Sequence, residues 1–187
     1  MSNHDWYELA VDGSLLQGDV LRDCPVFAVS GSLRWPLGAA PDIELEAKVF
    51  DLVVMTQSCD LENEKVEDVL LAQLVAWTDV VRAEAERGNE AVRSRKFRKL
   101  LIDGNVPGLS LLHRRDTSPS APWSVVDFHR LFTLPKAFVS RFAAGSGPRL
   151  RLRSPYREHL AQAFARYFMR VGLPHDAKAF EQEGAVA

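Results

Sequence analysis

The sequence predicts one α+β domain, and three observations lead to that prediction. The chain has 187 residues, of which 47% are hydrophobic and 26% are charged, as is usual for a single globular domain. Its first half contains apolar runs of strand length, some alternating with polar residues and some continuous. Apolar residues at helical spacing follow in the second half, most clearly over residues 155–171. We therefore expect residues 1–187 to form a single domain that combines strands with helices.

The first half of the chain contains the longer predicted strands. Ile43, Leu45 and Ala47 alternate with charged residues, which predicts a strand with one buried and one solvent-exposed face. The following run Leu52–Met55 is apolar throughout and predicts a central strand that is covered on both faces. The predicted strands are residues 19–29, 43–48, 52–55 and 69–77, and the Gly- and Pro-containing residues 31–41 are predicted to form a loop.

Helical spacing begins at residue 78. Thr78 or Asp79 can cap a first helix, and Gly88 separates it from a second. The predicted elements of the second half are helices at residues 78–87, 90–101 and 134–143 and short strands at residues 109–113, 125–128 and 150–153.

The last predicted helix spans residues 155–171. Ser154 is its expected N-cap, Pro155 suits the first helical position, and Gly172 ends it. We expect its apolar stripe to pack against the core, and a surface that binds a protein partner or a second copy of the chain is the alternative. The stripe consists of Tyr156, Leu160, Phe164, Tyr167 or Phe168, and Val171.

Charge is segregated along the chain, although the net charge is only -2. Residues 1–79 contain 15 acidic and 4 basic residues, whereas residues 80–173 contain 7 acidic and 18 basic residues. The simpler interpretation is that the acidic and basic segments fold against each other or that the cations solvate helix faces. The alternative is that the basic half binds nucleic-acid phosphates. The best phosphate-binding candidates are the clustered Arg93, Arg95, Lys96, Arg98 and Lys99.

The most site-like segment follows the predicted central strand, where a loop can hold reactive groups over a rigid scaffold. Cys59 is a candidate nucleophile if His113 or His129 reaches it, with Asp60 orienting the histidine. We expect, however, that Cys59 lies close to the core at the end of the central strand and is unreactive, because its acidic sequence neighbours disfavour a thiolate. The candidate catalytic residues are Thr56, Ser58, Cys59, Asp60 and His113.

Several function classes lack support in the sequence. The chain contains no phosphate-binding glycine motif, no zinc-protease motif and no serine-hydrolase motif, so we predict no cofactor. Its 2 cysteines, Cys24 and Cys59, lack metal-ligand spacing, and we predict no metal site. No apolar run is long enough to span a membrane and the start lacks a secretion signal, so we expect a cytoplasmic protein that does not bind membranes.

The order of the predicted elements resembles the PemK/MazF-like family of bacterial toxins. The resemblance rests on the Gly18-Asp19-Val20 opening, the strand Val53–Met55 ending in Thr56 and Ser58, the next strand at residues 70–76, and Val125–Asp127 before a short helix. It implies a small SH3-like β-barrel over residues 17–143, with residues 78–101 as a helical insertion and the helix at residues 155–171 as a further addition.

The resemblance also implies a function. Members of the family are endoribonucleases, and Thr56 matches the family's hydroxyl residue. The position of the family's catalytic arginine is occupied by residues 48–51, which contain no Arg. A guanidinium would be the main stabiliser of the transition-state charge in metal-free RNA cleavage. We therefore expect a toxin- or defence-associated binding or regulatory module that engages nucleic acid or a protein. The alternatives are an altered endoribonuclease and a cysteine-dependent enzyme that uses Cys59.

Overall fold

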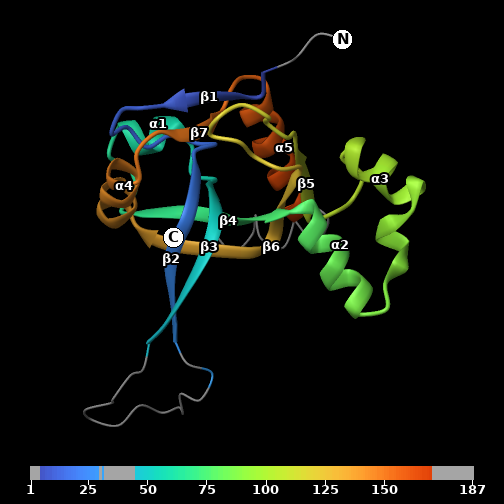
Figure 1. Ribbon diagram of the computed structural model, residues 1–187. Helices are drawn as coiled ribbons and strands as arrows, with labels where there is room; N and C mark the ends of the chain where they lie inside the picture. Colours follow the sequence, from blue (N-terminus) through green and yellow to red (C-terminus); the bar gives the residue numbers. More distant parts are fainter. Residues whose placement is uncertain (1–4, 30, 32–44, 170–187) are drawn as a thin grey trace, which may run out of the picture.

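The structure is a computed structural model that describes residues 5–29, 31 and 45–169. It is a mixed α+β fold with two antiparallel sheets, as Figure 1 shows, so the predicted fold class is confirmed. The larger sheet has the strand order β2 (Val20–Val29), β3 (Leu45–Val54), β4 (Asp68–Ala76), β6 (Ser124–Pro135) and β5 (Leu109–Leu112). The smaller sheet pairs β1 (Tyr7–Ala10) with β7 (Arg149–Leu152). The expected closed barrel is not formed by the described strands, because the larger sheet has open edges at β2 and β5.

The described residues also form five α-helices and one 3-10 helix. They are α1 (Ser58–Glu62), α2 (Trp77–Glu86), η1 (Glu90–Arg93), α3 (Arg95–Ile102), α4 (Lys136–Gly145) and α5 (Tyr156–Phe168). We call residues 77–102, which comprise α2, η1 and α3, the helical arm. The arm lies at the β5 end of the molecule, away from α4 (Figure 1). None of the helices in the described ranges is both long and apolar enough to cross a membrane.

The centre of the larger sheet is the most deeply buried part of the fold. Leu52, Val53 and Val54 of β3 are fully buried, and both hydrophobic clusters of the core draw residues from this strand. Burial on both faces is what a continuous apolar run predicts for a central strand. The prediction for residues 52–55 is therefore confirmed, although Met55 lies just past the end of β3.

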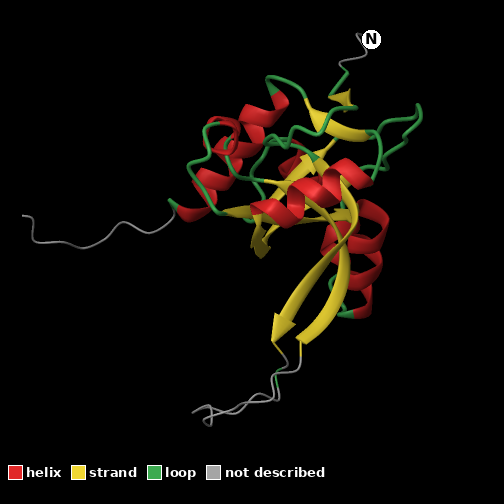
Figure 2. Ribbon diagram, turned by 90° about the vertical axis from the view of Figure 1, so that its left-hand side faces the viewer, coloured by secondary structure: helices red, strands yellow, loops and turns green. Residues whose placement is uncertain are grey.

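The outer half of β3 differs from the prediction. Residues 45–49 are exposed on both faces, and Leu45 retains 62% of its accessible surface. Figure 2 shows β2 and β3 running out together beyond the body of the sheet. On the β2 side Val26 is still buried and Phe27 contacts Phe138 of α4, but the side chains of residues 45–49 are left exposed. The expected half-buried strand at residues 43–48 is wrong for its described part. Residues 43 and 44 and the predicted loop, apart from Gly31, lie outside the described residues.

Two helices begin or break at positions other than those predicted. The expected helix at residues 90–101 is interrupted at Ser94, whose extended backbone separates η1 from α3. The Ser94 side chain accepts a 3.1 Å hydrogen bond from the Phe97 N–H and so caps α3. In α5 the expected cap is absent: Pro155 occupies the N-cap position, and no side chain caps the helix. The strand expected at residues 125–128 extends to Pro135.

Helix α5 packs on the core through the first part of its apolar stripe. Leu160 is buried, Tyr156 stacks on Trp6 with ring centroids 4.0 Å apart, and Phe164 meets Phe128 edge to face at 5.3 Å. Phe168 keeps 58% of its surface exposed, so the expected burial of the stripe is wrong at its end. Val171 lies outside the described residues.

A buried ionic cluster joins the two sheets. Asp19 lies just before β2 and is fully buried, and its carboxylate accepts hydrogen bonds from Arg149 Nε at 2.9 Å and from Arg151 Nη2 at 3.0 Å. Both arginines lie on β7 and are themselves buried. Here an acidic residue of the first half folds against basic residues of the second, as the simpler interpretation of the charge pattern expects.

Candidate functional site

The two hydroxyl side chains of the Thr56–Asp60 segment, Thr56 and Ser58, accept hydrogen bonds from the backbone of other elements. Thr56 Oγ1 accepts a 2.7 Å hydrogen bond from the Leu70 N–H at the start of β4. Ser58 Oγ accepts a 3.2 Å hydrogen bond from the Gln17 N–H, and Gln17 in turn donates from Nε2 to the Met55 carbonyl at 2.9 Å. These contacts tie the end of β3 to β4 and to the turn before β2. Both hydroxyls therefore have structural partners.

Cys59 was expected to lie close to the core. It is instead exposed, in the first turn of α1. Its Sγ lies 3.6 Å from Gln57 Oε1 and 3.7 Å from Asp60 Oδ1, and Asp60 forms an ion pair with Lys65 at 3.6 Å. Among the described residues, no histidine is recorded in contact with this thiol. The other cysteine, Cys24, is buried, and burial raises the pKa of its thiol to about 11.

His113 belongs to a different cluster. Its ring stacks near Trp6 at 5.8 Å and lies against Trp123 at 4.2 Å, measured between ring centroids. Its Nδ1 lies 2.7 Å from the Arg114 carbonyl oxygen. Cys59 and His113 thus contact different residues, and these contacts do not pair the thiol with a histidine base.

The five clustered basic residues at positions 93–99 of the helical arm are all exposed, as expected, but they differ in their partners. Arg93 forms an ion pair with Glu90 at 2.9 Å, and Lys99 forms one with Asp103 at 2.8 Å. Arg95, Lys96 and Arg98 form no ion pair with any residue in the described ranges. We call these three residues the basic surface.

The orientation of α3 places the basic surface on the outside of the arm. Phe97 lines a cavity under the arm and stacks on Trp77 with ring centroids 6.3 Å apart, and Leu101, one turn later, is buried. Residues four positions apart share a helix face, so this face of α3 points to the body. The three free cations therefore lie on its remaining, solvent-exposed sides.

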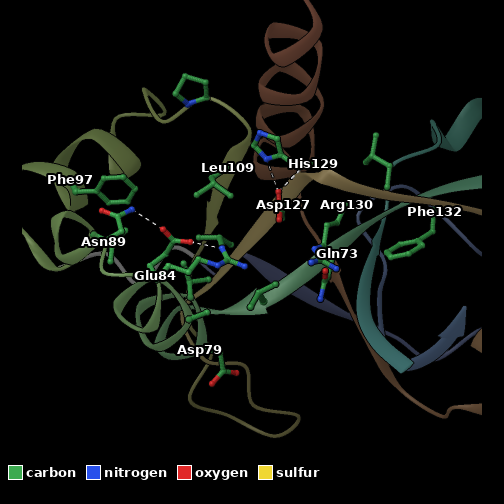
Figure 3. Close-up of a pocket in the computed structure, with 18 residues that line it drawn as sticks. Gln73, Asp79, Glu84, Asn89, Phe97, Leu109, Asp127, His129, Arg130 and Phe132 are labelled. Carbon is green, nitrogen blue, oxygen red and sulfur yellow. Dashed lines mark hydrogen bonds and ion pairs between the residues drawn. The ribbon is translucent and has the colours of Figure 1, made fainter. Parts of the chain in front are cut away.

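A cavity of about 980 Å³ lies between the helical arm and the larger sheet (Figure 3). We call it the arm cavity. Its wall on the arm side includes Val80, Glu84 and Phe97, and its floor includes Gln73 of β4 and Asp127 of β6. Volumes of this size are typical of sites for small organic ligands.

An aspartate and a histidine form the most organised polar pair in the arm cavity. Asp127 Oδ1 lies 2.9 Å from His129 Nδ1 and also accepts the His129 backbone N–H at 2.9 Å (Figure 3). A carboxylate only accepts hydrogen bonds, so Nδ1 of His129 is the donor of this bond.

Two backbone features position this pair. The β4–β6 register shifts so that Gln73 pairs with Asp127 while its neighbour Ala72 pairs with Leu131, which leaves residues 128–130 as a bulge. Gly108, with φ at +82°, faces the histidine, and a Cβ at this position would lie 2.1 Å from His129 Cε1. The ring therefore occupies space that only a glycine at position 108 leaves free.

Other polar groups of the cavity are either paired or unsatisfied. Glu84 accepts hydrogen bonds from Asn89 and Arg87, both at 2.7 Å, and the bond from Asn89 first, then that from Arg87, lowers the pKa of its carboxyl. Gln73 Oε1 is buried and has no hydrogen-bond partner within the described part of the chain. A buried acceptor without a donor costs about 1–3 kcal/mol, and because this oxygen is inaccessible to solvent it does not face the open space of the cavity.

The sequence offered little sign of the Asp127 and His129 pair. The sequence indicated His129 only as an alternative to His113 as the partner of Cys59. An Asp-x-His spacing on a strand places both side chains on one face, which could have identified the pair. The bulge and the approach of Gly108 depend on pairing with distant residues and have no local signal.

Comparisons of the chain with protein-family models, with curated proteins and with solved structures gave no significant match. Within the described residues, no group of three or more histidine, cysteine or carboxylate side chains could hold a metal ion.

Proposed function

We propose that the protein is a binding module for single-stranded nucleic acid and that the basic surface of the helical arm contacts the phosphates. The observation that carries this proposal is the exposure of Arg95, Lys96 and Arg98 without an ion-pair partner among the described residues. Cations already paired with carboxylates gain less from a phosphate than free cations do. Three free cations within four consecutive positions offer a compact site for counterion exchange with a phosphate chain.

The arm also provides what single-strand binders use besides charge. Such proteins combine cations that follow the phosphates with aromatic side chains on which bases stack. The stacked rings of Trp77 and Phe97 belong to the arm, and Phe97 borders the arm cavity. Helix α5, by contrast, uses most of its apolar stripe to pack on Trp6 and Phe128, which favours nucleic acid over a protein partner of α5.

We further propose that the strands around β3 and β4 are related to the PemK/MazF-like barrel and that the protein acts in a toxin- or defence-associated setting. The antiparallel order β2, β3, β4, β6 supports this relationship. The contacts of Thr56 support a structural role for the hydroxyl that matches the family's site. A binding role therefore fits these residues better than cleavage by that site.

The proposal is tested by fluorescence anisotropy with a labelled single-stranded oligonucleotide at low ionic strength. The test variant carries Arg95→Gln, Lys96→Gln and Arg98→Gln. Each exposed charge pair contributes about 1 kcal/mol at contact in water, so we expect the dissociation constant to rise about ten- to a hundredfold.

A matched variant removes the same charge elsewhere. Arg141, Arg153 and Arg166 are also exposed, form no ion pair with any described residue and lie outside the arm, and their replacement by glutamine should change the dissociation constant less than about threefold. Equal weakening by both variants would show that only the total charge matters. Absence of binding by the unmodified protein would refute the proposal.

A further inference from the structure

We propose that Trp123, the most exposed ring of a cluster of stacked aromatic side chains, stacks on one base of the bound strand. This inference rests on the proposed function and adds a base-contacting residue to the phosphate contacts of the basic surface. It is carried by the ring cluster, by the exposure of Trp123 and by the contacts that connect Trp123 to the helical arm.

Four segments of the chain each contribute one ring to the cluster. Trp6 lies just before β1 and His113 just after β5, whereas Trp123 lies just before β6 and Tyr156 begins α5. Trp6 stacks on Tyr156 with ring centroids 4.0 Å apart and an angle of 11° between the planes, and it stacks near His113 at 5.8 Å. His113 in turn lies 4.2 Å from Trp123. We call these four residues the aromatic cluster.

Hydrogen bonds from neighbouring segments fix the aromatic cluster in place. The Arg153 backbone N–H donates to the Trp6 carbonyl at 2.9 Å, and the Tyr7 hydroxyl donates to the His113 carbonyl at 2.7 Å. A ring that is already held in position loses little conformational freedom when a ligand binds. The aromatic cluster therefore offers a preorganised surface for a planar ligand.

Trp123 is the member of the cluster that a ligand can reach most easily. It keeps 38% of its surface accessible, whereas the other three rings are less exposed. Its recorded ring contact within the described residues is with His113. Stacking on an aromatic ring tolerates any sequence, because every base has a π-face. An exposed indole supported by further rings therefore suits an unstacked base of any type.

Two contacts connect Trp123 to the basic surface. The N–H of Trp77, the first residue of α2, donates to the Trp123 carbonyl at 2.8 Å. The Trp77 ring stacks on Phe97 with ring centroids 6.3 Å apart, and Phe97 is flanked in α3 by Lys96 and Arg98 of the basic surface. Sites for single strands cover about four nucleotides or more. A strand whose phosphates lie along α3 can therefore place one of its bases on Trp123.

Two probes of equal length and backbone charge test the inference: oligo-dT and an abasic deoxyribose-phosphate strand, each about twelve nucleotides long, within the site sizes of single-strand binders. Affinities are measured by anisotropy at low ionic strength for the unmodified protein and for Trp123→Ala. Loss of one stacked base lowers affinity about five- to a hundredfold. Trp123→Ala should lower the affinity for oligo-dT by this factor and leave the affinity for the abasic strand unchanged.

Two further variants separate stacking from a structural role of the ring. Trp123→Tyr keeps an aromatic face and should retain most of the preference for oligo-dT, but oligo-dT should quench its tryptophan fluorescence less because the stacked indole is gone. Phe168→Ala removes an exposed ring of α5 outside the aromatic cluster and should leave the preference unchanged. Thermal unfolding identifies a variant that fails to fold. If Trp123→Ala fails to fold, the fluorescence of Trp123→Tyr decides.

The outcomes separate this inference from the proposed function. If oligo-dT and the abasic strand bind the unmodified protein equally, the basic surface binds phosphates and the stacking site is refuted. Equal weakening of both probes by Trp123→Ala, or unchanged quenching in Trp123→Tyr, also refutes the stacking site. If neither probe binds at low ionic strength, the proposed function fails and the stacking site fails with it.

Discussion

Replacing the buried carboxylate of Asp19 should be among the most destabilising single changes in the protein. Asp19 has 0% exposure and accepts hydrogen bonds from Arg149, from Arg151 and from the Leu16 backbone N–H at 3.1 Å. Burial alone lowers the pKa of Arg151, but the hydrogen bond and charge of Asp19, together with the charges of Asp12 and Glu8, outweigh it and raise that pKa. Asp19→Asn keeps the shape of the side chain and removes its charge, so two buried guanidiniums lose their counterion.

The magnitude follows from the burial of all three groups. Removing one partner of a buried ion pair typically costs about 3–5 kcal/mol, because the remaining charge stays buried without compensation. A domain of this size has a total stability of roughly 5–15 kcal/mol, so about a fifth or more of it should be lost. At about 2–4 °C per kcal/mol, the midpoint of thermal unfolding should fall by about 10 °C.

Urea and thermal unfolding followed by circular dichroism measure this loss. The matched control is Asp51→Asn, which removes the carboxylate of a partly exposed pair with Arg22. Exposed pairs contribute about 0–1 kcal/mol, so the control should change stability little. An Asp19→Asn protein that unfolds within about 1 kcal/mol of the unmodified chain would contradict the reasoning, because the buried arginines would then not need their carboxylate.

Three further predictions concern the core, the thiols and pH. Phe164→Ala should lower the free energy of unfolding by about 2–4 kcal/mol, since the ring packs edge to face on the core. Phe168→Ala, on the exposed end of α5, should lower it by less than about 1 kcal/mol. Equal losses would contradict the packing of α5. A thiol reagent should label Cys59 in the folded protein and Cys24 only after unfolding. Mass spectrometry of the digested protein measures this, and labelling of Cys24 under native conditions would contradict its burial. Stability should fall above pH 9, because burial raises the pKa of the Cys24 thiol from 9.0 to about 11 and also raises the pKa of Tyr7. Folding therefore stabilises the neutral forms of both groups, and this contribution is lost as the pH rises through the folded pKa. Unfolding midpoints that stay constant between pH 9 and about 11 would contradict this.

Local sequence patterns predicted the elements whose burial follows from their own residues. The apolar run at residues 52–55 predicted a buried strand because such a run is stable only when both faces are covered. The alternation at residues 43–48 failed because burial of one face requires a covering layer, and the described part of this segment is left exposed where β3 runs beyond the body of the sheet. Whether a strand leaves the body of the sheet depends on its length relative to its neighbours, which no local pattern encodes.

The candidate site was partly predictable for the same reason. The exposure of Arg95, Lys96 and Arg98 follows from their density on one short helix, because so many charges cannot be buried together. The placement of Asp127 and His129 could not be predicted, since it depends on a register shift against Gln73 and on the approach of Gly108 from another strand. The separate environments of Cys59 and His113 likewise follow from strand order.

The salt dependence of single-strand binding tests the central claim most directly. The logarithm of the binding constant, plotted against the logarithm of the salt concentration, has a slope of about -0.7 per phosphate neutralised on a single strand. If Arg95, Lys96 and Arg98 each contact a phosphate, replacing all three by glutamine should make the slope shallower by about 2, with a folded arm confirmed by circular dichroism. An unchanged slope in that variant, with the unmodified protein binding the strand, would show that the phosphates are bound elsewhere and would contradict the assignment of the basic surface.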